Sequence, residues 1–232
     1  MTTIAENIKI INSRIRAAAL KSGRSADQIK LIAVSKTKPV QAILDALDAG
    51  QIHFGENRMQ ELHTKMSEIT QPDIQWHMIG TLQSNKIKYI ADNVHWIHSV
   101  GKAKYFNEIN KRAEQANRAI KILIQVNISA EDQKSGCEPS ELESILETAR
   151  QFDRVIIRGL MGMAQFTSDP EQVRGEFALL RKTMVDHQHL NDKNIQMNEL
   201  SMGMSNDFEV AIEEGATMVR VGSAIFGSRN YG

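Results

Sequence analysis

A lysine at the end of an apolar segment is the first residue in this chain that could do covalent chemistry. The segment reads Leu31-Ile-Ala-Val-Ser-Lys36, and strand alternation places Lys36 on the same side as Ile32 and Val34. Burial of the lysine stem among apolar neighbours would penalise the ammonium form and lower its pKa, leaving an amine that can condense with an aldehyde. The pattern indicates a Schiff-base lysine, and the alternative is a lysine that extends into solvent.

Two segments near the end of the chain carry groups that bind anions. Residues 200–205 form a glycine-containing turn that leads into a predicted helix from Phe208 to Glu214, and residues 218–223 end in an arginine, a glycine and a serine. Backbone amides, hydroxyls and a guanidinium in one place favour phosphate. The candidate residues are Ser205, Arg220, Gly222 and Ser223. The alternative is a helix cap beside a surface arginine.

Asn57 follows the segment His53-Phe-Gly-Glu, where a glycine lets the backbone approach a ligand closely. Asn57 could therefore contact a ligand. An asparagine before a predicted helix also caps the helix, and from the residues alone capping is the favoured interpretation.

The histidines do not predict a metal site. His187 and His189 are two residues apart, a spacing that does not bring two side chains to one helix face. His77 and His98 lie in or at the end of predicted strands, and we expect each to be a structural histidine with hydrogen-bond partners.

These residues need a scaffold, and the chain repeats short apolar segments with longer amphipathic, helical stretches between them. This alternation is typical of a parallel sheet with helices. The predicted strands are Leu31–Ser35, Gln51–Phe54, Ile74–Ile79, Val94–His98, Ile122–Asn127, Ile156–Leu160, Glu199–Met202 and Thr217–Val221. About eight strands predict a single closed (β/α)8 TIM barrel, with an open doubly wound sheet as the alternative. An extra N-terminal helix is expected, with Thr3 and Glu6 as its capping box.

Composition narrows the function further. Lys+Arg and Asp+Glu each number 28, so there is no basic excess for nucleic acid or anionic membranes. Cys137 is the only cysteine, which predicts an unpaired intracellular thiol. No signal peptide or long apolar segment is evident. We expect one domain over residues 1–232, located in the cytoplasm.

Seven sequence blocks together resemble the pyridoxal phosphate homeostasis protein family, which is similar to the N-terminal barrel domain of alanine racemase (fold type III). The blocks are Ala33-Val-Ser-Lys-Thr-Lys-Pro39, Phe54-Gly-Glu-Asn-Arg58, Trp76-His-Met-Ile-Gly80, Leu82-Gln-Ser-Asn-Lys86, Arg158-Gly-Leu-Met161, Leu200-Ser-Met-Gly-Met-Ser205 and Val219-Arg-Val-Gly-Ser-Ala-Ile-Phe-Gly227. They cover nearly the whole chain. Two small departures are Ser223, where threonine is common, and Gly101, where an acid is common.

The resemblance implies pyridoxal 5'-phosphate as the cofactor, held by Lys36 as an internal aldimine. It implies further that Ser205, Arg220, Gly222 and Ser223 surround the phosphate and ring, with Asn57 nearby. The implied role is cofactor buffering or delivery, with no catalysed reaction attached, no catalytic residue assigned and PLP-dependent apo-enzymes as candidate partners. We expect a monomer, because no unusual apolar stripe marks the predicted helices.

Two enzymatic alternatives remain open at this stage. The first is a PLP-dependent amino-acid racemase or lyase, which the barrel and the lysine would permit. A racemase needs a second proton-transfer group opposite the lysine, and the sequence ends at Gly232, soon after the eighth strand, with three tyrosines and no expected domain to supply one. The second alternative is a Schiff-base aldolase for sugar phosphates.

Overall fold

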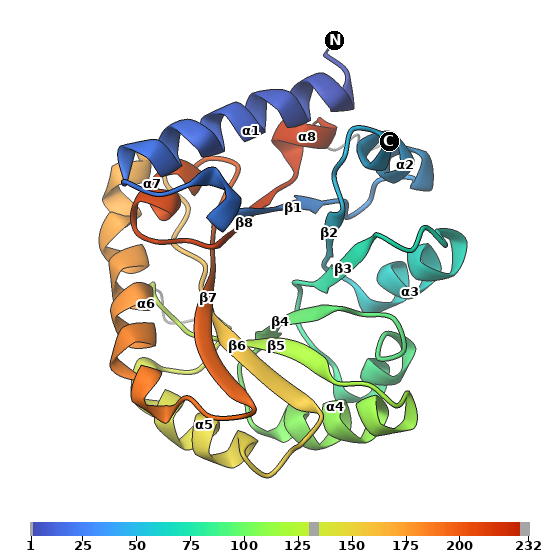
Figure 1. The fold of residues 1–232 in the computed structure, drawn as a ribbon, viewed down its shortest axis with the longest axis vertical. Helices are drawn as coiled ribbons and strands as arrows, with labels where there is room; N and C mark the ends of the chain where they lie inside the picture. The colour runs from blue at the N-terminus through green and yellow to red at the C-terminus, as the bar shows by residue number, and fades with distance from the viewer. Residues whose placement is uncertain (1, 130–134, 228–232) are drawn as a thin grey trace.

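A computed structural model describes residues 2–129 and 135–227, and this part of the chain forms a closed barrel. Eight parallel strands in these residues pair in sequence order, and β8 pairs with β1 (Figure 1). They are β1 (Lys30–Val34), β2 (His53–Glu56), β3 (Gln75–Met78), β4 (Trp96–Val100), β5 (Ile120–Gln125), β6 (Val155–Met161), β7 (Ile195–Met204) and β8 (Met218–Val221). The predicted TIM barrel is confirmed, and the open sheet is excluded.

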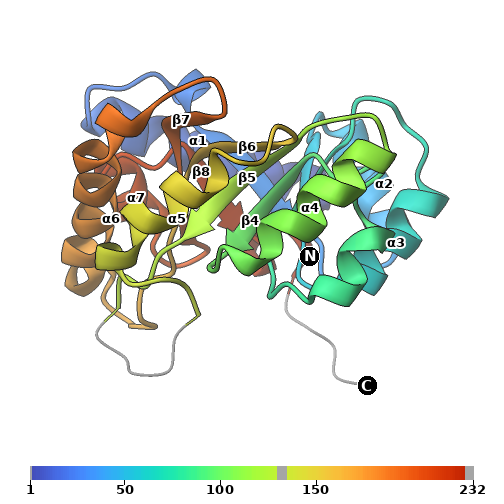
Figure 2. The same cartoon turned by 90° about the horizontal axis from the view of Figure 1, so that it is seen from below.

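The helices surround the strands, as Figures 1 and 2 show. They are α2 (Val40–Asp48), α3 (Met59–Glu68), α4 (Lys104–Gln115), α5 (Leu142–Ala149), α6 (Arg174–Asp186), α7 (Phe208–Glu213) and α8 (Ser223–Phe226). Each buries apolar residues; in α4 the buried residues are Phe106, Ile109 and Ala113. Between β3 and β4 the helical stretch is a 3₁₀ helix, Ser84–Tyr89, rather than an α-helix. Its buried Ile87 and the following buried Ile90 are three residues apart, the spacing that eclipses in 3₁₀ geometry.

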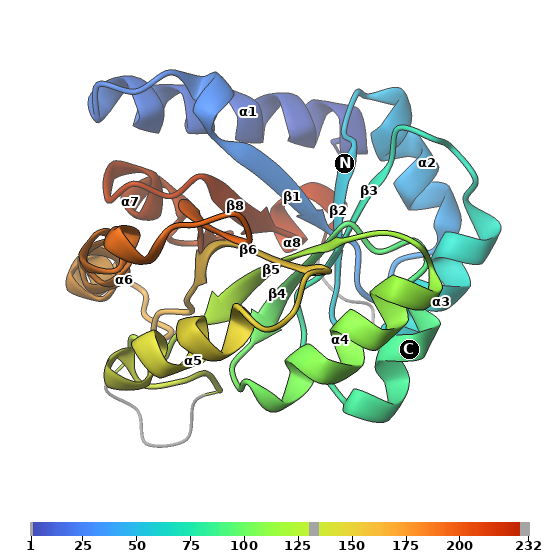
Figure 3. The ribbon, with the colours of Figure 1, turned by 60° about the horizontal axis from the view of Figure 1, so that its bottom comes forward.

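The extra N-terminal helix α1 (Ile4–Lys21) packs over the last two helices of the barrel. Thr3 and Glu6 form the predicted capping box. Asn7 Nδ2 donates to the Ile225 carbonyl at 2.8 Å, and the Arg14 guanidinium lies 2.6 Å from the Glu209 carboxylate. Because α7 and α8 are short, α1 covers this side of the barrel, as seen in Figure 3.

The barrel has two buried layers. The larger core lies between the helices and the outer faces of the strands. A smaller apolar cluster lies apart from it and consists of Ile32, Trp96, Leu123, Met161 and Met218. Buried polar side chains also lie on the strands. No helix within the described ranges has the length and apolar character needed to cross a membrane.

Gly159→Ala should destabilise the barrel by about 3 kcal/mol, because β6 and β7 approach closely at this residue. Gly159 has a φ of +145°, and a Cβ there would lie 1.9 Å from the Glu199 carbonyl oxygen. Gly175 in α6 is the control, because a Cβ there meets no atom within 4 Å; Gly175→Ala should be neutral or stabilising by up to about 1 kcal/mol. Urea unfolding measures both, and equal stabilities would contradict the close contact.

Candidate functional site

Lys36 lies two residues beyond the end of β1, at the carboxyl ends of the strands. It is half-buried and lines a pocket of about 240 Å³ together with Val34. Ile32 belongs to the small cluster that packs apart from the main core, so strand alternation oriented this segment correctly. Lys36 therefore lies on the pocket side of the barrel.

All six residues predicted for the site line this one pocket. They are Lys36, Asn57, Ser205, Arg220, Gly222 and Ser223. They come from the ends of β1, β2, β7 and β8, segments separated by up to 187 residues along the chain, from Lys36 to Ser223. Barrel closure brings β8 beside β1 and so completes the pocket.

The loops after β7 and β8 meet at the part of the pocket where an anion site was predicted. The Gly222 amide donates to Ser205 Oγ at 3.4 Å, and the Ser223 and Ser205 hydroxyl oxygens are 3.5 Å apart. Gly203, with a φ of +88°, allows the turn before Ser205, since a Cβ there would lie 2.6 Å from Ala211 Cβ. These long contacts leave two hydroxyls and an amide facing one point, where a phosphate oxygen could replace the weak mutual bonds.

Arg220 is the buried cation of the pocket, with 4% of its surface exposed. Its Nη1 donates to Ser201 Oγ at 2.6 Å and its Nη2 donates to the Gly162 carbonyl at 2.9 Å. Burial lowers the pKa of Arg220 to about 10, while the nearby Asp207 raises it, so the guanidinium stays charged at neutral pH. The surface-arginine alternative is wrong.

Asn57 does not cap the following helix. The N-cap residue of α3 is Arg58, which makes no side-chain capping bond. The backbone of Asn57 packs against Gly80, where a Cβ would lie 2.1 Å from the Asn57 carbonyl oxygen. The loops after β2 and β3 thus approach closely at Asn57, which lines the pocket, and the capping interpretation was wrong.

A buried ion-pair cluster braces the segment around Lys36, and the sequence reasoning missed it. Lys65 Nζ lies 2.6 Å from Glu56 Oε1 and donates to the Ser35 carbonyl at 2.9 Å. Ser35 Oγ also donates to Glu56 Oε1, at 2.7 Å. Burial raises the pKa of Glu56, and Lys65 opposes that shift. Glu56 and Lys65 are nine residues apart on different elements, so only the helix–strand contact reveals the pair.

The same cluster holds Thr37 in an unusual conformation. Thr37 has a φ of +63°, which is strained for a β-branched residue. Its amide donates to Glu61 Oε1 at 2.6 Å, and Glu61 in turn pairs with Lys65 at 2.8 Å. The cluster therefore fixes the backbone on both sides of Lys36.

Lys65→Met should destabilise the protein by about 3–5 kcal/mol, because it leaves the buried Glu56 carboxylate without its cation. The matched control is Lys182→Met, which removes an exposed ion pair with Asp186 one helical turn away. This control should change stability by less than about 0.5 kcal/mol. Thermal and urea unfolding of both variants measure the difference, and similar small losses would contradict a structural role for the cluster.

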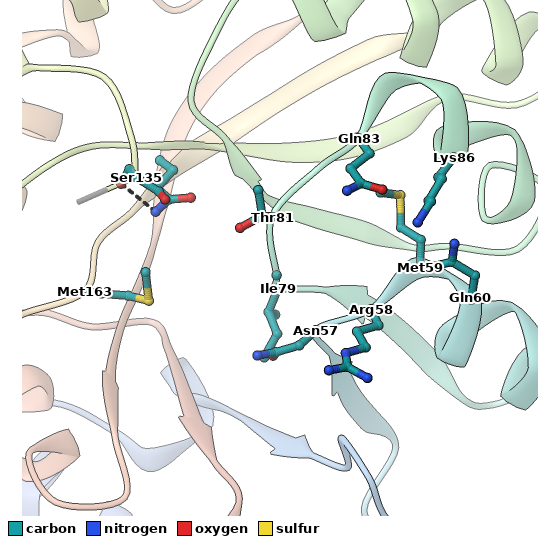
Figure 4. A pocket seen from close by; sticks show the side chains of 12 residues that line it. Asn57, Arg58, Met59, Gln60, Ile79, Thr81, Gln83, Lys86, Ser135 and Met163 are labelled. Carbon is teal, nitrogen blue, oxygen red and sulfur yellow. Dashed lines mark hydrogen bonds between the residues drawn. The ribbon is translucent and has the colours of Figure 1, made fainter. Parts of the chain in front are cut away.

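A second pocket of about 510 Å³ adjoins the first and shares Asn57, Ile79 and Met163 with it. Figure 4 shows the side of this pocket where Arg58 and Lys86 lie. The two pockets together give room for a ligand larger than the first pocket alone would hold.

The cysteine and the strand histidines lie in environments that indicate structural functions. Burial raises the pKa of the Cys137 thiol to about 12, which keeps it protonated and unreactive at neutral pH. His77 and His98 are fully buried, with hydrogen-bond partners at both ring nitrogens. No group of three histidine, cysteine or acidic residues in the described part of the chain is arranged to hold a metal ion.

Fold and pocket define a (β/α)8-barrel protein with a lysine, an arginine and two serine hydroxyls lining one pocket at the carboxyl ends of its strands. A family model described as "Alanine racemase, N-terminal domain" matches residues 3–230. A Pseudomonas aeruginosa protein named "Pyridoxal phosphate homeostasis protein" is 41% identical over 232 residues, which cover 100% of this chain and 98% of that protein. This chain therefore belongs to the pyridoxal phosphate homeostasis proteins of the alanine racemase N-terminal domain family.

Solved structures agree with this assignment. PipY of Synechococcus elongatus, solved with PLP bound, is 38% identical with a TM-score of 0.79, and the match covers 92% of this chain and 99% of that one. Alanine racemase of Clostridium difficile has a TM-score of 0.70 at 14% identity and shares the fold alone. The match covers 97% of this chain and 56% of that enzyme.

Proposed function

We propose that this protein binds pyridoxal 5'-phosphate in the Lys36 pocket and serves in the intracellular homeostasis of that cofactor, by buffering or delivering it. The observation that carries the proposal is the convergence of Lys36, Arg220 and the Ser205–Ser223 anion site on one pocket. The relatives' name and the PLP-bound PipY structure support the same ligand.

The donor set fits the cofactor group by group. Ser205 Oγ, Ser223 Oγ and the Gly222 amide would hold the phosphate. Arg220 would face the ring nitrogen, and Asn57 would lie beside the ring. The Lys36 amine, which lines the same pocket, would hold the cofactor through its aldehyde group, as the family resemblance implies. When bound, the cofactor supplies an electrophilic aldehyde on an electron-withdrawing ring.

Arg220 favours cofactor storage over catalysis. A guanidinium donates hydrogen bonds and accepts none, so it would keep the ring nitrogen unprotonated and the ring a weaker electron sink. The described pocket lining contains no tyrosine and no carboxylic acid that could exchange protons with a substrate on the side opposite Lys36. Turnover of any amino acid that depends on Lys36, tested with a panel at saturating cofactor, would overturn the carrier function in favour of a racemase or lyase.

The direct test locates the modified lysine. The protein is mixed with pyridoxal phosphate, reduced with borohydride, digested and analysed by mass spectrometry. The expected product is one reduced adduct on Lys36. An adduct spread over surface lysines, or trapping by a sugar phosphate in place of pyridoxal phosphate, would refute the proposal.

The proposal extends to one monomeric domain over residues 1–232, a cytoplasmic location and hand-over to PLP-dependent apo-enzymes.

A further inference from the structure

A chain of hydrogen bonds links the amino-terminal end of β2 to Arg220. His53 Nδ1 lies 3.1 Å from His77 Nε2, and His77 Nδ1 lies 2.8 Å from His98 Nε2. His98 Nδ1 lies 2.9 Å from Ser201 Oγ, which accepts from Arg220 Nη1 at 2.6 Å. His77, His98, Ser201 and Arg220 are all buried.

This chain of hydrogen bonds crosses the barrel interior. β2, β3 and β4, which carry the three histidines, are neighbours in the sheet, but β4 and β7 are not. The contact between His98 on β4 and Ser201 on β7 must therefore span the interior. His53 is the first residue of β2, whereas Arg220 lines the pocket at the opposite ends of the strands.

Arg220 sets the direction of every hydrogen bond in the chain. A guanidinium only donates, so Ser201 Oγ must accept from it. His98 Nδ1 is the other partner of Ser201 Oγ among the described residues. If His98 donated as well, the buried Ser201 hydrogen would have no acceptor, which is costly. Ser201 therefore donates to His98 Nδ1.

The same reasoning assigns the ring hydrogen of each histidine. With Nδ1 accepting, neutral His98 carries its hydrogen on Nε2 and donates it to His77 Nδ1. His77 then carries its hydrogen on Nε2 and donates it to His53 Nδ1. An additional proton on any ring would place two donors face to face in a buried contact.

We propose that His53, His77, His98 and Ser201 form a one-directional relay that positions Arg220 for the cofactor ring, with all three imidazoles neutral and protonated at Nε2. The Ser201 and Gly162 bonds take one hydrogen each from Nη1 and Nη2. Three of the five N–H groups of the guanidinium remain, and the relay fixes how they face the pocket. His77 and His98 are thus positioning residues that act through Ser201 and Arg220. The inference rests on the proposed function only for the identity of the ligand.

The first test uses the protein without cofactor. Nitrogen-15 NMR of histidine-labelled protein at pH 7.5 should show neutral Nε2–H tautomers at His53, His77 and His98. An Nδ1–H tautomer or an imidazolium at His77 or His98 would overturn the relay, whatever the protein binds.

The second test measures pyridoxal phosphate affinity in variants that do not touch the pocket lining. His77→Leu should weaken binding about three- to tenfold, the effect of losing one neutral hydrogen bond, although His77 does not line the pocket. His77→Gln keeps one donor and one acceptor and should restore affinity to within about twofold. Ser201→Ala cuts the relay at Arg220 and tests the same point if His77→Leu does not fold.

A matched control separates positioning from general destabilisation. Phe106→Leu truncates a fully buried residue of α4 that packs against Phe152, away from the relay. It should lower stability and leave affinity unchanged. Equal affinity loss in Phe106→Leu and His77→Leu, or unchanged affinity in both His77→Leu and Ser201→Ala, would show that these hydrogen bonds only stabilise the core and do not position Arg220.

If the unaltered protein binds no pyridoxal phosphate, the proposed function fails and the role of the relay toward the ring fails with it, whereas wrong tautomers refute the relay alone.

Discussion

Lys36→Ala should abolish the yellow Schiff-base absorbance of the protein mixed with pyridoxal phosphate and weaken binding by about 100-fold, or about 2.7 kcal/mol. The covalent bond to the amine is lost, and only the phosphate and ring contacts remain. The measurements are absorbance spectra and equilibrium dialysis of the variant beside the unaltered protein.

Lys38 provides the matched control, because it lines the same pocket. Its Nζ donates to the carbonyl oxygens of Phe226 at 2.9 Å and Gly227 at 3.2 Å, which indicates a structural function. Lys38→Met should keep the absorbance. A colourless unaltered protein, or a Lys36→Ala variant as yellow as its parent, would contradict the assignment of Lys36.

Folding stability should fall steeply as the pH drops from about 7 to 5. Burial lowers the pKa of His77 and His98 well below the usual value, lowers that of His53 to about 4, and lowers that of His95. Because these folded-state pKa values lie below the unfolded value, the unfolded chain binds more protons in this range. The stabilisation is complete above about pH 7 and is lost as the pH falls.

The magnitude follows from proton counting. Each histidine that is protonated only on unfolding contributes a slope of up to about 1.4 kcal/mol per pH unit, so the two fully buried rings together contribute up to about 2.8 kcal/mol per pH unit. The surrounding charges are Lys30, Lys121, Arg118, Arg220 and Glu199; all but Glu199 are cations that further disfavour imidazolium. Glu56 and Asp207 act in the opposite sense, because their raised pKa values favour the folded state toward acid and offset part of the slope.

Urea unfolding at pH 7.5, 6.5 and 5.5 measures this slope. His63→Gln is the control, because His63 is exposed on α3, and it should leave the slope unchanged. A flat stability profile over this range would contradict the expectation that the buried imidazoles stay neutral in the folded protein, and would conflict with the relay.

Local patterns in the sequence determined the barrel and most of the pocket. Strand alternation at residues 31–36 put Lys36 on the pocket side, and the glycine-serine turns after the last two strands indicated the anion site. Both groups of residues line one pocket because parallel strands end at the same face of a barrel, so a residue's place along its own strand locates it at that face.

Contacts between segments that are distant in the sequence could be found only in the tertiary structure. Asn57 lines the pocket and does not cap α3, whose N-cap residue is Arg58, and its backbone packs closely against Gly80 in the loop after β3. Lys65 and Glu56 pair because α3 folds back onto β2, and His98 reaches Ser201 only across the closed barrel. Burial then sets the protonation of these groups, since a desolvated side chain takes its charge state from the partners that the fold supplies and not from its neighbours in the sequence.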